Sequence, residues 1–166
     1  MEIKQATPSE FVEVLFLIRE CVKDMNSKGL RQWNNASPSP EQLKEELEKG
    51  TIFLIQELGI VKGLMKLTSE LPSEYTDISW KNVMARPLFI KLFAIHPLWH
   101  NSNISEKLIE FAEIYAKENN YSGIRLDIMD NYPVGAGFFE NKQFIVAGTF
   151  QSDYQKTPFV CYEKSL

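Results

Sequence analysis

The residues best suited to chemistry lie in a loop between two apolar segments. Residues 87–95 (PLFIKLFAI) form a nearly continuous apolar run of strand length, and residues 104–119 carry apolar side chains at helical spacing. The loop between them reads HPLWHNSN. A loop that opens directly into a helix presents unpaired backbone N–H groups at the positive end of the helix dipole. This arrangement suits a pyrophosphate, although many α/β proteins have such a junction without a ligand.

Other patterns in the chain are better explained by packing than by ligands. The segment Gly135-Ala136-Gly137 lacks the third glycine of a dinucleotide-binding loop. His96 and His100 straddle a proline and lack the glutamate of a zinc-binding helix, so we predict no metal site. Cys21 and Cys161 are too few for a disulfide framework, and we expect both to be buried thiols.

The elements that must position the loop follow from periodicity and from turn residues. We predict helices over residues 8–27, 40–48, 104–119 and 134–142, and strands over 51–57, 60–68, 87–95, 123–129, 144–150 and 159–162. Leu58-Gly59 joins two of the strands as a hairpin. Gly63 suggests a bulge or a close approach of another chain segment. Residues 69–83 show no clear period.

Length and charge exclude several classes of protein. The 166 residues, 44% of them hydrophobic, suit one domain over residues 1–166. A formal net charge of −4 argues against nucleic acid as the main partner. The sequence shows no secretory signal and no apolar run of membrane-spanning length, so we expect a cytoplasmic protein without a membrane partner.

The order and spacing of these pieces resemble the GNAT acetyltransferase family over nearly the whole chain. Phe93-Ala94-Ile95 before His96-Pro97 resembles the family's L-A-V-x-P, and Arg125-Leu126-Asp127 resembles its L-R-L-D. Asn131 matches the asparagine that follows that strand. Residues 139–144 (FENKQF) stand where the family has Y-E-K-L-G-F, and residues 29–33 (GLRQW) resemble a G-x-x-Q-W segment of some members.

The resemblance implies an α/β (mixed α+β) fold of the GNAT acyl-CoA N-acyltransferase type, with a central, mostly antiparallel mixed sheet flanked by helices. It implies acetyl-CoA as co-substrate, with the pantetheine arm along the strand and the pyrophosphate on the loop. The positions that it assigns to this ligand are Phe93, Ala94, Ile95, His100, Asn101, Ser102, Asn103, Ile104, Ser105, Lys107, Asn131 and Phe139. The polar residues of the loop have capping of the helix as the alternative role, and Asn131 that of a turn residue.

Several positions depart from the family pattern. The motif Gln/Arg-x-x-Gly-x-Gly/Ala aligns with His100, Asn103 and Ser105, and none of the three matches. The tyrosine that often protonates the leaving thiolate aligns with Phe139. Tyr132 is a substitute acid by proximity in the sequence, with an ordinary packing aromatic as the alternative.

No general base can be assigned from the sequence. Glu70, Glu74, Asp77 and Asp127 are the carboxylates in reach, and we expect each to be an ordinary solvated side chain.

Three functions are consistent with these residues. The first is an N-acetyltransferase that acts on the amine of a small molecule or peptide, as a monomer or homodimer, with acceptor contacts from residues 29–35 and 69–83. The second is a CoA- or acyl-CoA-binding module of the same fold without efficient turnover. The third is an interaction protein that has lost the ligand and uses exposed aromatics such as Trp33 or Trp80.

Overall fold

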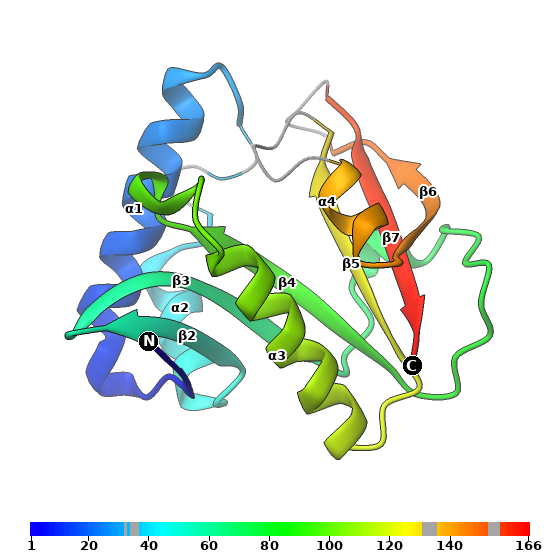
Figure 1. The fold of residues 1–166 in the computed structure, drawn as a ribbon. Coiled ribbons are helices and arrows are strands. Elements are labelled where there is room, and N and C mark those ends of the chain that lie inside the picture. The colour runs from blue at the N-terminus through cyan, green and yellow to red at the C-terminus, as the bar shows by residue number, and fades with distance from the viewer. Residues whose placement is uncertain (32, 34–36, 131–135, 153–156) are drawn as a thin grey trace. The chain divides into compact units, whose positions relative to one another are not determined.

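The computed structural model of the protein describes residues 1–31, 33, 37–130, 136–152 and 157–166 (Figure 1). In this part of the chain, seven strands form one sheet, in the order β1 (Glu2–Gln5), β2 (Ile52–Glu57), β3 (Ile60–Thr68), β4 (Pro87–Ile95), β5 (Gly123–Met129), β7 (Phe159–Ser165) and β6 (Ile145–Phe150). β4 and β5 are parallel, whereas β1–β2, β2–β3, β5–β7 and β6–β7 are antiparallel. The mixed, mostly antiparallel sheet with flanking helices confirms the fold expected from the sequence.

The chain divides into two compact units. Unit 1 comprises Met1–Leu67 and Leu92–Phe111, and unit 2 comprises Thr68–Lys91 and Ala112–Leu166. Three elements contribute to both units, namely β3 (Ile60–Thr68), of which only the last residue belongs to unit 2, β4 (Pro87–Ile95) and α3 (Ile104–Glu118).

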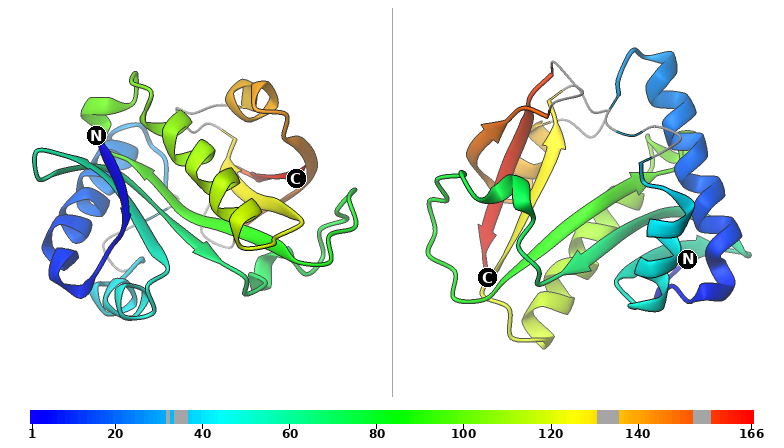
Figure 2. Two further views of the ribbon diagram at one scale, coloured as in Figure 1. Left: turned by 60° about the horizontal axis from the view of Figure 1, so that its bottom comes forward. Right: turned by 180° about the vertical axis from the view of Figure 1, so that it is seen from behind.

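Unit 1 packs helices on both faces of its strands. The strands are β1 (Glu2–Gln5), β2 (Ile52–Glu57) and β3 (Ile60–Thr68), together with the last part of β4. Helices α1 (Phe11–Ser27) and α2 (Pro40–Glu48) cover one face, and the beginning of α3 lies on the other (Figure 2). The helices bury one apolar stripe each, for example Leu17 and Ile18 of α1.

Local signals in the sequence account for the ends of these elements. Ser39 caps α2, since its hydroxyl accepts from Gln42 N at 3.1 Å and its N–H donates to the Gln42 side chain at 2.8 Å. The β2–β3 turn has positive φ at both central residues, 51° at Leu58 and 77° at Gly59, as a two-residue hairpin of this twist requires. The predicted hairpin is therefore confirmed.

Unit 2 contains β5 (Gly123–Met129), β6 (Ile145–Phe150), β7 (Phe159–Ser165), the first part of β4, the short helix α4 (Ala136–Asn141) and the 3-10 turn η2 (Ser73–Tyr75). Side chains of β7 alternate between its two faces. Tyr162 stacks on Phe139 of α4 at 5.2 Å between ring centroids, whereas Cys161 belongs to a buried cluster with Tyr75 and Phe89. Residues 73–82 therefore cover the face opposite α4.

The structure corrects some predicted boundaries. β7 continues to Ser165, beyond the predicted end at 162, and pairs with β5 up to Gly123. The sequence did not predict this extension, because a charged residue such as Glu163 is not typical of a buried strand. The Glu163 side chain is nevertheless fully buried, and it contacts polar partners. α3 ends at Glu118 instead of 119, and α4 covers Ala136–Asn141 instead of 134–142, of which residues 134 and 135 lie outside the described residues.

Two further expectations concern single residues. Cys21 and Cys161 are both free and buried, as predicted. Trp33 is only 9% exposed, so the expectation of an exposed aromatic at this position is wrong. Among the described residues, no helix combines the length and the apolar composition needed to cross a lipid bilayer.

Candidate functional site

The end of β4 is the first part of the candidate site, and it lies in unit 1. Leu92 has a φ of 52°, in the left-handed region that residues other than glycine rarely adopt. Such outliers concentrate at functional sites. Phe93, Ala94 and Ile95 follow, and the last two are buried. His96 N then donates to the Lys62 carbonyl of β3 at 2.9 Å, which fixes the end of the strand.

A chain of short-range hydrogen bonds leads from β4 to α3. The 3-10 turn η3 (Pro97–Trp99) is capped by His96, whose Nδ1 accepts from Leu98 N at 3.3 Å. Trp99 N donates to the His96 carbonyl at 2.9 Å, and Ser102 N donates to the Trp99 carbonyl at 3.0 Å. The loop is therefore tied together by hydrogen bonds of its own backbone and of the His96 ring.

The first turn of α3 sits close to the sheet because β3 has no side chain at Gly63. A Cβ at that position would lie 2.9 Å from Ile104 Cγ2 and 3.1 Å from the Ala94 carbonyl oxygen. Ile104 and Ser105 are buried, whereas Asn101, Ser102 and Asn103 are exposed. The close approach predicted at Gly63 is confirmed, and it places the N-terminus of α3 beside the end of β4.

The polar residues of the loop serve the helix start in this structure. Lys107 N donates to the Asn103 carbonyl at 3.1 Å, which makes Asn103 the residue at the N-cap. The Ser102 hydroxyl donates to the Trp99 carbonyl at 2.6 Å and accepts weakly from Ile104 N at 3.4 Å. The side chain of Lys107 is half-buried one turn into the helix.

The departures from the glycine-rich motif do not strain this loop. Within the described residues, the non-glycine positions with positive φ are Leu58, Leu92, Asn120 and Gln143, and none of them lies in the loop. The backbone conformation at Asn103 and Ser105 is therefore one that residues other than glycine adopt. Helix-terminal amides and the Lys107 ammonium are the donors that a pyrophosphate requires, so the residues present fit an acyl-CoA phosphate.

The carbonyl of Ile95 has two side-chain donors that the sequence did not reveal. His100 Nε2 lies 2.9 Å from this oxygen, and Cys21 Sγ of α1 lies 3.2 Å from it. Because a carbonyl only accepts, His100 donates from Nε2. His100 thus ties the loop back to the strand end, a contact that depends on folding and leaves no signal in the spacing of residues.

The remaining predicted site residues are in unit 2 or outside the described residues. Phe139 is 1% exposed and packs against Tyr162, Phe138 and Phe144. It provides no hydroxyl, and a contact with the cofactor stays a prediction. Asn131 and Tyr132 lie outside the described residues. No group of three or more His, Cys, Asp or Glu side chains that could hold a metal occurs among the residues described.

Unit 2 contains a partly buried ionic network at Lys91, on the face covered by residues 73–82. Lys91 Nζ lies 2.5 Å from Asp127 Oδ1 and 2.7 Å from Glu74 Oε1, and the Tyr75 hydroxyl donates to the same Asp127 oxygen. Burial opposes the charge on Lys91, but Asp127 and Glu74 outweigh it and raise the pKa of the ammonium. Burial and Asp127 together raise the pKa of the Tyr75 hydroxyl well above its usual range.

This network overturns one interpretation drawn from the sequence. The Asp127 side chain is only 7% exposed, so it is not a solvated carboxylate as expected. One of its oxygens already accepts from both an ammonium and a phenol. Asp127 therefore anchors residues 73–82 to the sheet.

A second polar cluster holds the other end of the same segment. Glu163 Oε1 accepts from Lys81 N at 2.7 Å and from Asn82 N at 2.9 Å. Arg125 donates to the Asn82 carbonyl at 2.9 Å, and its guanidinium lies 4.4 Å from the centre of the Trp80 ring. We call residues 73–82 the strap, because both of its ends are bonded to side chains of β5 and β7.

Comparisons with solved structures support the fold of the chain. No family model matches the chain, and no curated protein matches it. Solved structures of GNAT-family acetyltransferases from Listeria monocytogenes 4b F2365 and Streptococcus agalactiae 2603 do match. The first is 18% identical with a TM-score of 0.77 and covers 99% of this chain and 94% of its own. The second is 16% identical with a TM-score of 0.80 and covers 99% and 95%.

A third match is the PaiA N-acetyltransferase from Thermoplasma acidophilum, solved in complex with coenzyme A. It is 16% identical with a TM-score of 0.71 and covers 99% of this chain and 98% of its own. These likenesses span nearly the full length of each chain. The protein therefore has the fold of GNAT acetyltransferases.

Proposed function

We propose that this protein is an N-acetyltransferase of the GNAT family that transfers an acetyl group from acetyl-CoA to the amine of a small molecule or peptide. The observation that carries the proposal is the β4–η3–α3 junction, in which Gly63 lets the start of α3 approach the sheet and the loop backbone needs no glycine. The full-length likeness to GNAT structures supports the same proposal.

The chain's own residues have separable tasks in this proposal. Backbone amides of Asn103 to Ser105 and the Lys107 ammonium hold the pyrophosphate, whereas Ser102 N, predicted to join them, donates to the Trp99 carbonyl. Phe93 and Ile95 lie along the pantetheine arm, to which the resemblance also assigns Asn131. When bound, acetyl-CoA supplies the thioester that an amine attacks. Since Phe139 has no hydroxyl, Tyr132 is the proposed donor to the leaving thiolate.

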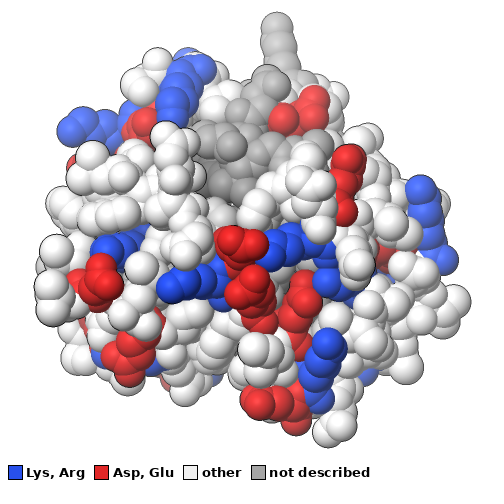
Figure 3. Space-filling view, viewed as in Figure 1, with Lys and Arg blue, Asp and Glu red and all other residues white. Residues whose placement is uncertain are grey.

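Charge on the surface agrees with a small or peptide acceptor better than with nucleic acid. Figure 3 shows Lys and Arg interspersed with Asp and Glu on the face that carries α3, without a continuous basic area. The formal net charge of −4 points the same way. We expect acceptor contacts from residues 29–35 and 69–83 of a cytoplasmic monomer or homodimer.

A second candidate is a CoA-binding module without efficient turnover. It is favoured by the joint departure of His100, Asn103, Ser105, Phe139 and Gln143 from the family pattern. The loss of a general acid commonly costs about 10²- to 10⁴-fold in rate, which would leave binding intact.

Release of free CoA thiol from acetyl-CoA, measured across a panel of primary amines, separates the two candidates. Release that depends on one class of amine supports the transferase. Binding of CoA without amine-dependent release supports the module, and an absence of binding contradicts both. A Tyr132→Phe variant with unchanged turnover would remove Tyr132 as the acid.

A further inference from the structure

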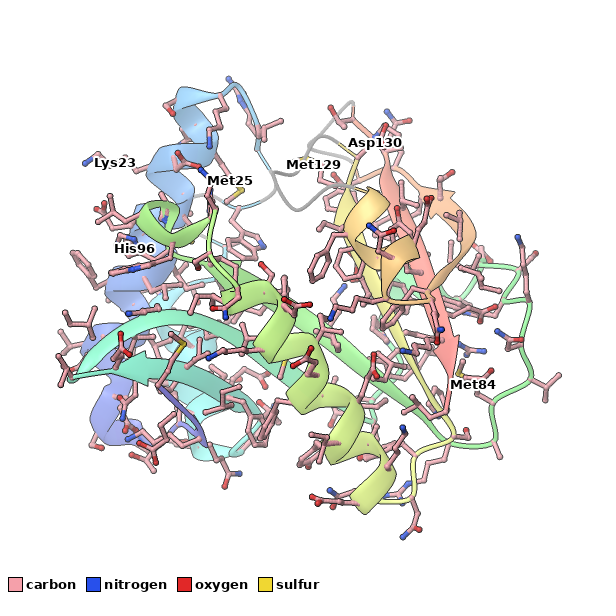
Figure 4. All side chains as sticks on the ribbon, in the orientation of Figure 1. Lys23, Met25, Met84, His96, Met129 and Asp130 are labelled. Atoms are coloured by element: carbon pink, nitrogen blue, oxygen red, sulfur yellow. The ribbon has the colours of Figure 1, made fainter. Side chains whose placement is uncertain are left out.

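His96 occupies the point at which β4 turns into the proposed phosphate loop. His96 is only 8% exposed, and Figure 4 labels it beside α1 at the start of the η3 turn. The ring packs edge-on against Trp99 at 4.9 Å and lies 6.2 Å from the ring of Phe16 on α1. Its Nδ1 accepts from Leu98 N. A neutral imidazole that accepts at Nδ1 carries its proton at Nε2.

The groups around His96 favour the neutral ring on balance. Burial lowers the pKa of His96, Glu20 of α1 raises it, and His100 lowers it again, so that the pKa falls below the ordinary value of 6.5. On the β3 side, Lys62 lies 5.3 Å from the centre of the Trp99 ring and is paired with Glu57. The cap on η3 is therefore fully present above pH 6.5 and is lost as the pH falls through the lowered value.

A second proton on His96 would reverse the role of Nδ1. The nitrogen would become a donor that faces the N–H of Leu98, and two donors cannot share a hydrogen bond. Trp99 N is bonded to the His96 carbonyl, and both the N–H and the hydroxyl of Ser102 are bonded to the Trp99 carbonyl. A change at His96 is thus connected by successive hydrogen bonds to Ser102, whose hydroxyl accepts from Ile104 N in the first turn of α3.

The other histidine lacks this sensitivity. His100 donates from Nε2 to the Ile95 carbonyl, and Nε2 remains a donor when the ring is protonated. Only two histidines occur in the chain, so an imidazole titration between pH 5 and 7.5 belongs to one of them.

We infer that neutral His96 is a positioning residue for the phosphate loop, and that the loop leaves its binding conformation when this imidazole is protonated. The inference rests on the proposed function only in naming coenzyme A as the ligand. Affinity for coenzyme A should then fall on acidification, by at most about tenfold per pH unit below the midpoint. His96→Asn keeps an acceptor at the cap without a titrating group.

NMR of the ¹⁵N-labelled protein tests the inference without any ligand, with His100→Gln used to assign the two imidazoles. We expect the Nε2–H tautomer of His96 at pH 7.5, and an indole N–H of Trp99 that shifts with the His96 midpoint. An Nδ1–H tautomer, or a Trp99 signal that does not follow His96, would overturn the inference whatever the protein binds.

Calorimetric titration with coenzyme A at pH 5.5 and 7.5 is the second arm. The dissociation constant at pH 5.5 divided by that at pH 7.5 should be several-fold larger for the wild type than for His96→Asn. Because both proteins bind the same ligand, the titration of the ligand's own phosphate affects both ratios equally. Equal ratios contradict the inference. If coenzyme A binds neither protein at either pH, the proposed function fails, and the NMR arm alone decides the role of His96.

Discussion

Gly63 is the residue at which the candidate site depends on a missing side chain. In Gly63→Ala the new Cβ would meet Ile104 Cγ2 at 2.9 Å and the Ala94 carbonyl at 3.1 Å, and the backbone oxygen cannot move aside cheaply. We expect a loss of about 1–3 kcal/mol in the free energy of unfolding. Affinity for coenzyme A should fall roughly tenfold, because the start of α3 is pushed from the sheet. Urea unfolding and calorimetry measure the two effects.

Gly137→Ala in α4 is the matched control. No atom lies within 4 Å of a Cβ at Gly137, and alanine is the better helix former, so stability should stay within about 1 kcal/mol of the wild type. If the two variants behaved alike, the close packing of α3 on Gly63 would not be what positions the loop.

Gln143 carries backbone strain where the family pattern has glycine. Its φ is 66°, and Phe144 N donates to the Phe139 carbonyl at 3.0 Å, as in a helix that ends with a left-handed residue. Gln143→Gly should therefore raise the free energy of unfolding by about 1 kcal/mol. A fall in stability for Gln143→Gly would show that its side chain matters more than its backbone.

Among the elements, the strap depends on partly buried charges that contact the sheet. In Lys91→Met, Asp127 and Glu74 lose their cation while Asp127 stays 7% exposed. Removing one partner of a buried pair is costly, and we expect a loss of about 2–4 kcal/mol in the free energy of unfolding. Amide exchange in residues 73–82 should rise with it.

An exposed ion pair provides the comparison for Lys91. Lys28 pairs with Asp24 at 2.6 Å on α1, with 44% of the lysine side chain exposed. Lys28→Met should change stability by no more than about 0.5 kcal/mol. Equal effects of the two substitutions would mean that the network at Lys91 contributes nothing beyond a surface pair.

Local signals explain which elements could be predicted from the sequence. The Ser39 capping box, the Leu58-Gly59 turn and the apolar run of β4 each act within a few residues, and each appears in the structure. The strap could not be predicted, because it is fixed by partners such as Glu163, which lies 82 residues from Lys81. The strap residues are fixed by bonds to polar side chains of the sheet, and their sequence therefore shows no helical or strand period.

The candidate site divides in the same way. The sequence predicts the strand–loop–helix order, because the apolar strand, the loop and the periodic helix are adjacent in the chain. The sequence does not predict the bonds of His100 and Cys21 to the Ile95 carbonyl, since Cys21 belongs to α1, 74 residues away. Positive φ at Leu92 also leaves no trace in an apolar strand sequence.

For the whole molecule, similarity to GNAT structures is much clearer in the fold than in the sequence. GNAT structures with 16–18% identity align over 99% of the chain, although no family model matches it. Packing patterns that many side chains satisfy preserve a fold, whereas a binding motif needs particular residues. Because the fold is preserved while the motif residues differ, we propose that this chain binds a pyrophosphate at the start of α3 with side chains other than those of the motif.

Calorimetric titration with coenzyme A and acetyl-CoA, carried out on the purified wild type, on Asn103→Trp and on the control Glu118→Trp, tests this proposal. Both substitutions place an indole at an exposed position of α3 or its cap, one at each end of the helix. We expect saturable binding by the wild type and by Glu118→Trp, and at least about tenfold weaker binding by Asn103→Trp. An absence of saturable binding by the wild type, or equal binding by all three proteins, would contradict a phosphate site at the start of α3.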